Sequence, residues 1–288
     1  MTAPPGDGDA REAGRTRAPL GRRLVEVTGV EALGAYRLIR ARDGDGPADP
    51  QPGQFYMLAA GAGWGAGQDE RPYLPRAFSF ARVEPAGPRG GAELSFLLED
   101  IGPGTARLAA LGPGESLWVA GPFGLGFTAP GAGRRPLLVG GGIGVAPVLA
   151  LHDTLAAGAR VLLGFRSALH AEAAGLFAGE TPALATDDGS LGRAGLVTEL
   201  LVEELGDDPA ALVFACGPPA MLEAVRDVCS ARGVPAQLAL ESGMACGYGA
   251  CFGCVVPTVA GYVRLCLDGP VLDAELLADT FAGPPAAP

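Results

Sequence analysis

Four of the six cysteines of this chain lie close together near its C-terminal end, in the order Cys246-x4-Cys251-x2-Cys254-x11-Cys266. Thiolates are soft ligands that suit iron–sulfur clusters and zinc. Gaps of four and two residues followed by a distant fourth cysteine are typical of the plant-type site for a 2Fe–2S cluster. The spacing therefore predicts that these four cysteines ligate such a cluster.

The residues between the first three cysteines fit a loop that wraps a cluster closely. Gly247, Gly249 and Gly253 permit positive φ angles, with which backbone N–H groups can point at inorganic sulfide. A structural zinc site is the alternative, but zinc ligands usually come as two pairs of closely spaced cysteines. Here three ligands share one loop and the fourth stands apart, which favours the iron–sulfur cluster.

A glycine-rich turn follows a strand-like apolar run at residues 136–139 and precedes a helical pattern. Gly141, Gly142 and Gly144 allow the backbone to approach a diphosphate at the start of a helix. Pro147 fits the first helical turn, where its missing N–H costs nothing. The turn differs from the Gly-x-Gly-x-x-Gly fingerprint of classical dehydrogenases, but it predicts a dinucleotide site.

An acidic turn, Asp187 and Asp188, follows a later strand-like run at residues 183–186. Carboxylates beside the adenosine ribose repel a 2′-phosphate, so this turn favours NAD over NADP as the cofactor. A solvated acidic turn without a ligand is the alternative interpretation.

Two segments in the first half of the chain suit a further phosphate-containing ligand. In the first, an arginine supplies a cation for a phosphate and a serine supplies a small hydrogen-bond donor. In the second, glycines and a threonine begin a short helical stretch whose free N–H groups suit an anion. Each segment alone could equally be an ordinary strand or turn. The residues are Arg76, Ala77, Phe78 and Ser79 in the first segment and Gly102, Gly104 and Thr105 in the second.

The secondary structure expected to position these groups changes along the chain, from strands alone to alternating strands and helices. Short runs separated by Gly and Pro turns fill residues 22–128, which is typical of an all-β barrel or sandwich. From about residue 130, apolar strands alternate with helical stretches, which indicates a parallel α/β sheet. Strands are expected at 24–28, 35–39, 54–58, 76–83, 92–98, 116–119, 136–139, 160–165, 183–186, 212–215 and 235–241, and helices at 146–157, 196–205 and 218–232.

We therefore expect a multidomain α+β chain with a boundary in the Pro- and Gly-containing linker at 129–135. Its expected parts are a disordered tail at 1–21, an antiparallel β-barrel domain at 22–129, a parallel-sheet α/β domain at 130–236 and a small cluster-binding domain at 237–288.

Composition excludes some classes of function. The net charge of −11 argues against nucleic acid as a partner, because phosphate binding requires a basic surface. Apolar runs end well before the roughly 18 residues of a membrane span. Residues 1–20 lack the apolar core of a signal peptide, so we expect a cytoplasmic protein.

Nearly all of residues 22–270 resembles the electron-transfer subunit of class 1B dihydroorotate dehydrogenase, within the ferredoxin reductase superfamily. The segments that match the family most closely are Thr-Asp-Asp-Gly-Ser at 186–190 and the cysteine-containing segment at 241–254. The family commonly has a basic residue where Gly243 stands, and the superfamily commonly has proline where Ala77 stands. Because of Gly243, a cluster potential or a partner different from those of the family stays open.

The resemblance implies that the chain binds FAD, a 2Fe–2S cluster and NAD. Arg76 then pairs with a flavin phosphate, Ser79 lies near the reactive edge of the flavin ring, and residues 102–105 hold the FAD diphosphate. These two segments, with a third Gly- and Pro-containing segment at 121–127 that resembles the family's turn at the end of the barrel, would together make residues 22–129 an FAD-binding domain.

The resemblance also places the turn formed by Cys216, Gly217 and Pro218 beside the nicotinamide. Cys216 would be a small polarizable wall there and not a nucleophile. Glu241 is the polar group expected near the contact between flavin and nicotinamide. The implied catalytic positions are thus Ser79, Cys216 and Glu241.

The partner implied by the resemblance is an FMN-containing dihydroorotate dehydrogenase catalytic subunit, in a two-plus-two heterotetramer. Electrons from dihydroorotate would pass singly through the cluster to FAD and then, as hydride, to NAD+. Two alternatives stay open from the sequence: a stand-alone NAD(P)H reductase with a soluble acceptor, and a non-enzymatic iron–sulfur or zinc scaffold. Arg76, Ser79 and Thr105 argue against the scaffold.

Overall fold

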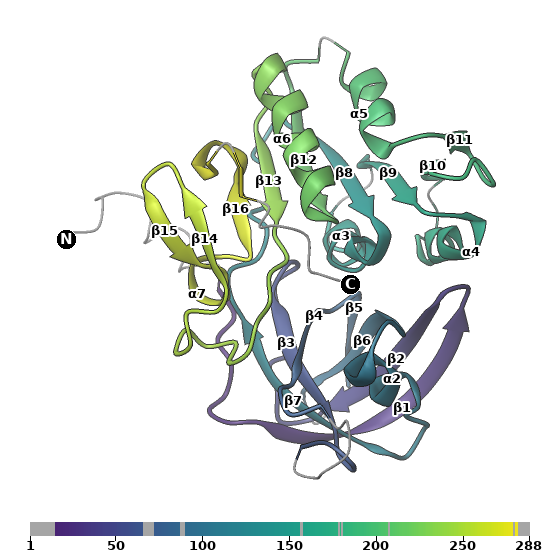
Figure 1. Ribbon diagram of the computed structural model, residues 1–288, viewed down its shortest axis with the longest axis vertical. Helices are drawn as coiled ribbons and strands as arrows, with labels where there is room; N and C mark the ends of the chain where they lie inside the picture. The colour runs from purple at the N-terminus through teal and green to yellow at the C-terminus, as the bar shows by residue number, and fades with distance from the viewer. Residues whose placement is uncertain are drawn as a thin grey trace.

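The computed structural model describes residues 15–281 except 66–71, 87–89, 156–157, 178, 180, 207 and 279. Two seven-stranded sheets and a two-stranded hairpin make up the described strands. Figure 1 shows the first sheet in the lower half of the molecule and the second in the upper half. Most of the expected N-terminal tail lies outside the described residues. No helix in the described part of the chain is long and apolar enough to cross a membrane.

The first sheet is antiparallel, with strand order β4-β3-β7-β1-β2-β6-β5. The described pairings leave β4 and β5 as its edges and include no pair that closes it into the expected barrel. Helix α2 (Pro103–Ala109) follows β6. The strands are β1 (Arg23–Leu33), β2 (Tyr36–Asp43), β3 (Phe55–Ala60), β4 (Arg76–Ser79), β5 (Arg82–Pro85), β6 (Ala92–Glu99) and β7 (Ser116–Phe123).

The strand predicted at 76–83 is two strands. β4 pairs with β3, whereas β5 pairs with β6 at the opposite end of the strand order. The chain therefore has to change direction between them, at Phe80 and Ala81, both of which are buried. The sequence did not reveal this bend, because residues 76–83 contain no Gly or Pro that would mark a turn.

The second sheet has the order β11-β10-β9-β8-β12-β13-β16, and all its strands except β16 run parallel. The chain moves outward from β8 through β9 and β10 to β11 and then returns to β12 on the other side of β8, which makes the end of β8 a switch point of the topology. The strands are β8 (Arg135–Gly141), β9 (Arg160–Phe165), β10 (Ala183–Thr186), β11 (Arg193–Ala194), β12 (Ala211–Cys216), β13 (Ala236–Ala239) and β16 (Val271–Asp273).

Helices cover both faces of the second sheet, and alternate residues of β8 point to them. Leu137 and Val139 pack with α5 (Val197–Leu205) and α6 (Pro219–Arg232), whereas Leu138 packs with α3. The alternation is the period of two that a strand imposes. The remaining helical elements here are η1 (Gly142–Gly144), α3 (Val145–His152), α4 (Ala168–Ala171) and η2 (Glu172–Leu176). Helix α3 ends five residues before the expected end at 157, and residues 156–157 lie outside the described residues.

Helix α3 is buried along its length because it lies between the two sheets. All residues from Val145 to Leu151 are buried. One continuous apolar cluster contains Tyr36 and Leu97 of the first sheet together with Leu149 of this helix. The two domains therefore share a core.

The C-terminal segment returns to the second sheet. It forms the hairpin β14 (Val255–Thr258) and β15 (Gly261–Arg264), α7 (Leu265–Asp268), and then β16 and η3 (Ala274–Leu276). β16 pairs antiparallel with β13, so the expected boundary between 236 and 237 lies inside a strand of this sheet.

The start of β16 also contacts the first domain. The N–H of Leu240 donates to the carbonyl of Pro270 at 2.9 Å, and the N–H of Leu125 donates to the carbonyl of Gly269. Residues 269–270 therefore join the first domain, the second sheet and the segment that carries the cysteines.

Candidate functional site

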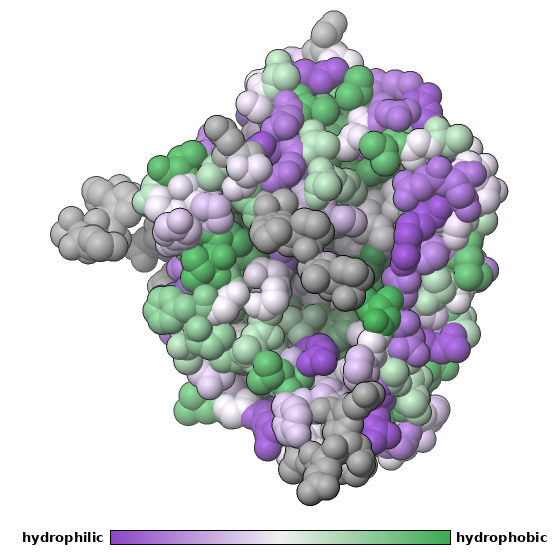
Figure 2. All heavy atoms as spheres, viewed as in Figure 1, coloured by the Kyte–Doolittle hydropathy of each residue, from purple (hydrophilic) through white to green (hydrophobic). Residues whose placement is uncertain are grey.

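The carboxyl ends of the parallel strands face the first domain across a cleft, the usual place for ligands in open α/β sheets. Two cavities of about 420 and 470 Å3 occupy it. The first lies among β4, α3 and the segment after β13, and the second among the Gly-rich turn, the ends of β9 and β10, and α6. Figure 2 shows the hollow between the two halves of the molecule, with pale and apolar side chains in it.

The first cavity has a fixed cation at one end. Arg76 Nη1 donates to the carbonyl of Leu74 at 2.6 Å, and its guanidinium lies 5.9 Å from the ring centroid of Trp64. A Cβ on Gly104 would lie 2.5 Å from Arg76 Nε. Gly104 therefore lets the arginine approach α2, although it does not itself line the cavity.

Thr105 lines the same end, but its hydroxyl already has partners. It accepts from the N–H groups of Ile101 and Gly102 and donates to the Gly102 carbonyl, each at 3.0 Å. Gly102 thus forms the turn that begins α2 and does not line the cavity. Arg76, Ala77, Phe78 and Ser79 of β4 all do.

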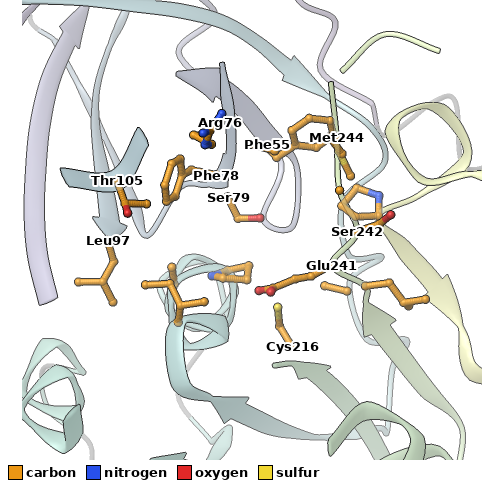
Figure 3. Close-up of a pocket in the computed structure, with 18 of the residues that line it drawn as sticks. Phe55, Arg76, Phe78, Ser79, Leu97, Thr105, Cys216, Glu241, Ser242 and Met244 are labelled. Atoms are coloured by element: carbon orange, nitrogen blue, oxygen red, sulfur yellow. The ribbon is translucent and has the colours of Figure 1, made fainter. Parts of the chain in front are cut away.

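Three predicted catalytic residues converge on the middle of this cavity. In Figure 3, Ser79 from β4 and Cys216 from the end of β12 lie on either side of the Glu241 carboxyl group. Burial, followed by the nearby Glu241, raises the pKa of the Cys216 thiol well above its usual range. Cys216 therefore stays protonated, as a small apolar wall and not a nucleophile.

Glu241 is accessible from the cleft but surrounded by protein on its other sides. This burial raises the pKa of its carboxyl group to about 7. Near neutral pH the carboxyl group therefore populates both protonation states, and it can donate as well as accept a hydrogen bond. Its location between Ser79 and Cys216 makes it the titratable group at the centre of the site.

The Gly-rich turn lines the second cavity through Gly141 and Gly142. Gly142 has φ +54 and open space where a Cβ would be. Gly144 has a packing role: a Cβ there would lie 2.3 Å from the carbonyl oxygen of Cys216. Gly217 is likewise close to Met221, while Pro218 lines the cavity.

The two aspartates of the acidic turn differ in role. Asp187 lines the second cavity. Asp188 Oδ1 accepts from the backbone N–H of Ser190 at 2.9 Å and from its hydroxyl at 2.6 Å, and these bonds lower the pKa of Asp188. Asp188 therefore shapes the turn, whereas Asp187 is the one of the two carboxylates that lines the cavity.

The structure brings the four clustered cysteines together as two pairs. Cys254 Sγ lies 3.2 Å from Cys266 Sγ, and the Cys251 thiol hydrogen-bonds Cys246. Cys266 also interacts electrostatically with Cys246, which links the pairs. Two thiolates for each of two irons is the ligand set of a 2Fe–2S cluster, so the residues present fit that group.

Backbone N–H groups surround the first sulfur. Burial opposes ionisation of Cys246, but N–H groups of Cys251, Tyr248 and Ala250 and the Cys251 thiol lower its pKa to about 6. Such a thiolate is a ready metal ligand. Among the described residues, no three or more His, Cys, Asp or Glu side chains surround one point as they would for a single metal ion.

The cysteine loop packs against the wall of the first cavity. A Cβ on Gly247, at φ +80, would lie 2.6 Å from Met57 Cγ of β3 and 3.4 Å from the ring of Phe123. Phe123 contacts Phe55 at 5.8 Å between ring centroids, and Phe55 lines the cavity. The side chains of Met57, Phe123 and Phe55 therefore connect the cysteine loop to the wall of the cavity, and Figure 1 shows the loop beside β3.

Several lining residues were not foreseen from the sequence. Tyr36, Glu99, Arg166 and His170 line the second cavity, and Glu99 and Ile143 line both cavities. Tyr36 and Glu99 belong to the first domain, where nothing in their local sequence indicates a nucleotide. The only signal was positional, because Arg166 directly follows a parallel strand.

Comparisons with known proteins agree with this geometry. Residues 241–278 match the family model described as the iron–sulfur cluster binding domain of dihydroorotate dehydrogenase B. The chain is 40% identical over 235 residues to the dihydroorotate dehydrogenase B (NAD(+)), electron transfer subunit, of Geobacillus thermodenitrificans, which covers 78% of this chain and 85% of that protein. The subunit of the same name from Caldanaerobacter subterraneus is 36% identical over 233 residues, covering 78% and 86%.

Solved structures share the fold. An NADH-dependent reduced ferredoxin-NADP oxidoreductase superposes with a TM-score of 0.71 at 22% identity, covering 90% of this chain and 91% of that chain. A ferredoxin NADP+ reductase from Neisseria gonorrhoeae with bound FAD and NADP gives 0.56 at 17% identity, covering 74% and 92%. These similarities show a ferredoxin reductase-like arrangement of an antiparallel and a parallel sheet.

Replacing Arg76 by Ala should weaken FAD binding far more than it affects folding. A charge-assisted contact to phosphate is worth about 1.5–3 kcal/mol, or roughly 10- to 150-fold in affinity. Retained FAD is measured by absorbance after dilution and gel filtration. Arg40→Ala, on β2, removes a partly exposed arginine paired with Glu31 and should keep FAD. Full FAD retention by Arg76→Ala at low protein concentration would exclude the phosphate contact.

Replacing Cys251 by Ser should abolish iron and acid-labile sulfide binding. The exposed Cys251 side chain contributes little packing, so the loss comes from the ligand itself. Metal binding also stabilises the loop, and proteolysis within 243–254 should therefore accelerate. Cys229→Ala, in α6, should retain both iron and sulfide. Stoichiometric zinc without labile sulfide in the unmodified protein would contradict the cluster assignment.

Proposed function

Because the chain belongs to the family of dihydroorotate dehydrogenase B electron transfer subunits, we propose that it passes electrons from a dihydroorotate-oxidising partner to NAD+. It does so through a 2Fe–2S cluster at the four clustered cysteines and an FAD in the first cavity. Residues 22–129, which contain the first sheet, are then the FAD-binding domain. The second sheet then belongs to the NAD-binding domain, and the segment between β13 and β16 holds the cluster.

The observation that carries this proposal is the contact between the cysteine loop and the FAD cavity. Gly247 touches Met57 and Phe123, and Phe123 packs on Phe55 of the cavity wall. A hydride donor and acceptor alone would need no cluster. A one-electron centre packed directly behind the flavin wall is useful when another protein supplies single electrons.

The chain's own residues bind and orient the reacting groups. Arg76 binds a phosphate of FAD and so fixes the flavin along β4. Ser79 and Glu241 face the middle of the cavity, where they can hydrogen-bond the flavin edge and the nicotinamide carboxamide. Cys216 fills the remaining side without ionising and excludes water from the contact.

The cofactors supply the chemistry that side chains cannot. Bound FAD converts between the one-electron chemistry of the cluster and the two-electron chemistry of NAD. The shifted Glu241 carboxyl group can hold or release a proton beside the flavin near neutral pH.

The partner of this chain is, in our proposal, an FMN-containing catalytic subunit in a two-plus-two assembly that docks over the cysteine loop. Tyr248 is 62% exposed and Phe252 is 63% exposed. Phe252 keeps φ +58, a costly angle for a bulky residue, and Arg264 lies 4.9 Å from its ring centroid. Val259 and Tyr262 extend this exposed surface along β14 and β15, a region that Figure 2 shows as partly apolar.

NAD is the proposed nucleotide because Asp187 lines the second cavity. A carboxylate at the adenosine ribose accepts hydrogen bonds from the 2′-hydroxyl and repels a 2′-phosphate. Asp188 supports this only indirectly, through its bonds to Ser190.

Co-expression with a dihydroorotate dehydrogenase catalytic subunit from the same genome should yield a stable complex with dihydroorotate-dependent NAD+ reduction. Tyr248→Asp should abolish the complex because it places a charge in the contact, while leaving NADH oxidation by an artificial acceptor intact. Leu24→Asp, at an equally exposed residue of β1, should leave the complex unchanged. A chain that forms no complex and rapidly reduces a ferredoxin would instead be a stand-alone reductase.

NADH should be preferred over NADPH in a steady-state assay with an artificial electron acceptor. Asp187→Ala should raise kcat/KM for NADPH by roughly 10-fold or more, because it removes one close repulsion. Asp188→Asn, which disturbs the turn without removing the cavity carboxylate, should change the ratio less. Equal use of both cofactors by the unmodified protein would show that Asp187 does not face the ribose.

A further inference from the structure

The Tyr36 side chain is anomalous. It comes from β2 of the first domain, is 1% exposed and lines the second cavity. Its hydroxyl is buried and has no hydrogen-bond partner among the residues that the structure describes. A buried polar group without a partner is costly and rare, so the hydroxyl is expected to have one in another state of the protein.

The groups around this hydroxyl are charged. The Tyr36 ring contacts His170 edge-on at 5.8 Å between centroids. Burial raises the pKa of Tyr36, Glu99 adds to the rise and Arg166 offsets it. The hydroxyl therefore stays protonated, can donate a hydrogen bond, and lies near both a carboxylate and a guanidinium.

Glu99 is occupied by other donors. It hydrogen-bonds Arg166 across the domain boundary, and His170 Nε2 lies 3.4 Å from the same oxygen. Arg166 is 63% exposed at the end of β9, so its side chain has room to move. His170 is held by Ser167 at 2.9 Å and stays in place.

Arg166 faces the cavity beside Gly141 and Gly142, where a diphosphate would lie. A diphosphate offers a guanidinium two negative groups, whereas Glu99 offers one. A guanidinium group can donate two parallel hydrogen bonds to a phosphate group, which favours transfer of Arg166 from Glu99 to the diphosphate. Once Arg166 leaves Glu99, the carboxylate lacks its main donor, and Tyr36 is the nearby donor without a partner.

We propose that Arg166 binds the diphosphate of the dinucleotide, and that Glu99 exchanges Arg166 for the Tyr36 hydroxyl when the nucleotide arrives. This inference rests on the proposed function, since it requires a dinucleotide in the second cavity. In the nucleotide-free state Arg166 and Glu99 are paired and Tyr36 is unpaired. In the bound state all three groups have partners, and two of them come from the first domain.

Isothermal titration of the FAD-loaded, oxidised protein with NAD+ and with ADP-ribose tests the exchange. Arg166→Gln should weaken both ligands by roughly 10- to 150-fold, because it removes a charge-assisted contact. Tyr36→Phe should weaken both by about 10-fold, since Glu99 is then left without its replacement donor. Glu99→Gln should not weaken binding and should strengthen it by up to about 5-fold, because it releases Arg166.

The decisive measurement is the double variant. Because Tyr36 acts only through the Glu99 carboxylate, Tyr36→Phe should change affinity less than about 2-fold when Glu99 is already Gln. Equal losses from Tyr36→Phe with and without the carboxylate would overturn the exchange. So would unchanged affinity of Tyr36→Phe, or weaker binding by Glu99→Gln.

Thermal unfolding without nucleotide separates this role from simple packing. Tyr36→Phe keeps the ring and deletes an unpaired hydroxyl, so the unfolding midpoint should stay equal or rise. A lowered midpoint together with lost affinity would make Tyr36 a merely structural residue. Tyr56→Phe is the matched control: its hydroxyl is also buried and unpaired, but it lies in the core of the first sheet and lines neither cavity of the cleft.

Failure of the exchange is distinguishable from failure of the proposed function. If the unmodified protein binds neither NAD+ nor ADP-ribose, the proposed function is wrong. If it binds both and the Arg166→Gln variant binds equally well, only the present inference is wrong. Loss of NAD+ affinity with unchanged ADP-ribose affinity would place the contact away from the diphosphate and also overturn it.

Discussion

The antiparallel pairing of β16 with β13 is the constraint on which the arrangement of the cofactor regions depends. It brings the chain back after the cysteine loop and fixes both ends of that loop to the second sheet. At the same place, Gly269 and Pro270 bond to Leu125 of the first domain and to Leu240. Shifting this strand would move the cysteines, the Glu241 segment and the first domain relative to one another.

The chemistry of the central cavity follows from what that arrangement buries. Glu241 lies two residues after the end of β13, beside the cleft, and burial raises the pKa of its carboxyl group. Cys216 ends the neighbouring strand β12. Burial raises the pKa of its thiol, and the nearby Glu241 raises it further. The two groups that the family resemblance singled out thus become a proton-holding carboxyl group and an inert thiol, through location and not through special partners.

The features of the structure that the sequence predicted best are those determined by residues close together in the sequence. The cysteine spacing indicated four sulfurs in one place because three of them share a single loop, and the family resemblance it supported is confirmed by the relatives. The Gly-rich turn was recognisable because a strand and a helix on either side fix its location. The change from an antiparallel to a parallel sheet was visible in the lengths and flanks of the apolar runs.

The parts that could not be predicted depend on contacts between distant segments. Gly104 is small to admit Arg76, and Gly144 is small to admit the carbonyl of Cys216, and the motifs did not indicate these packing roles. The division of the 76–83 run depends on which strand each half pairs with. Asp188 has the same residue type as Asp187, and only the turn geometry shows that its oxygen is occupied.

The cavity beside the Gly-rich turn takes one wall from each half of the chain, with Tyr36 and Glu99 supplied by the first. The parallel-sheet half is therefore not a self-sufficient module, although its topology is that of a common nucleotide-binding unit. Recombination that exchanged this half alone between distant relatives would pair its Arg166 with a foreign surface. Substitutions on β2 and at the end of β6 therefore have to remain compatible with the residues at the end of β9. The two halves must evolve as one unit.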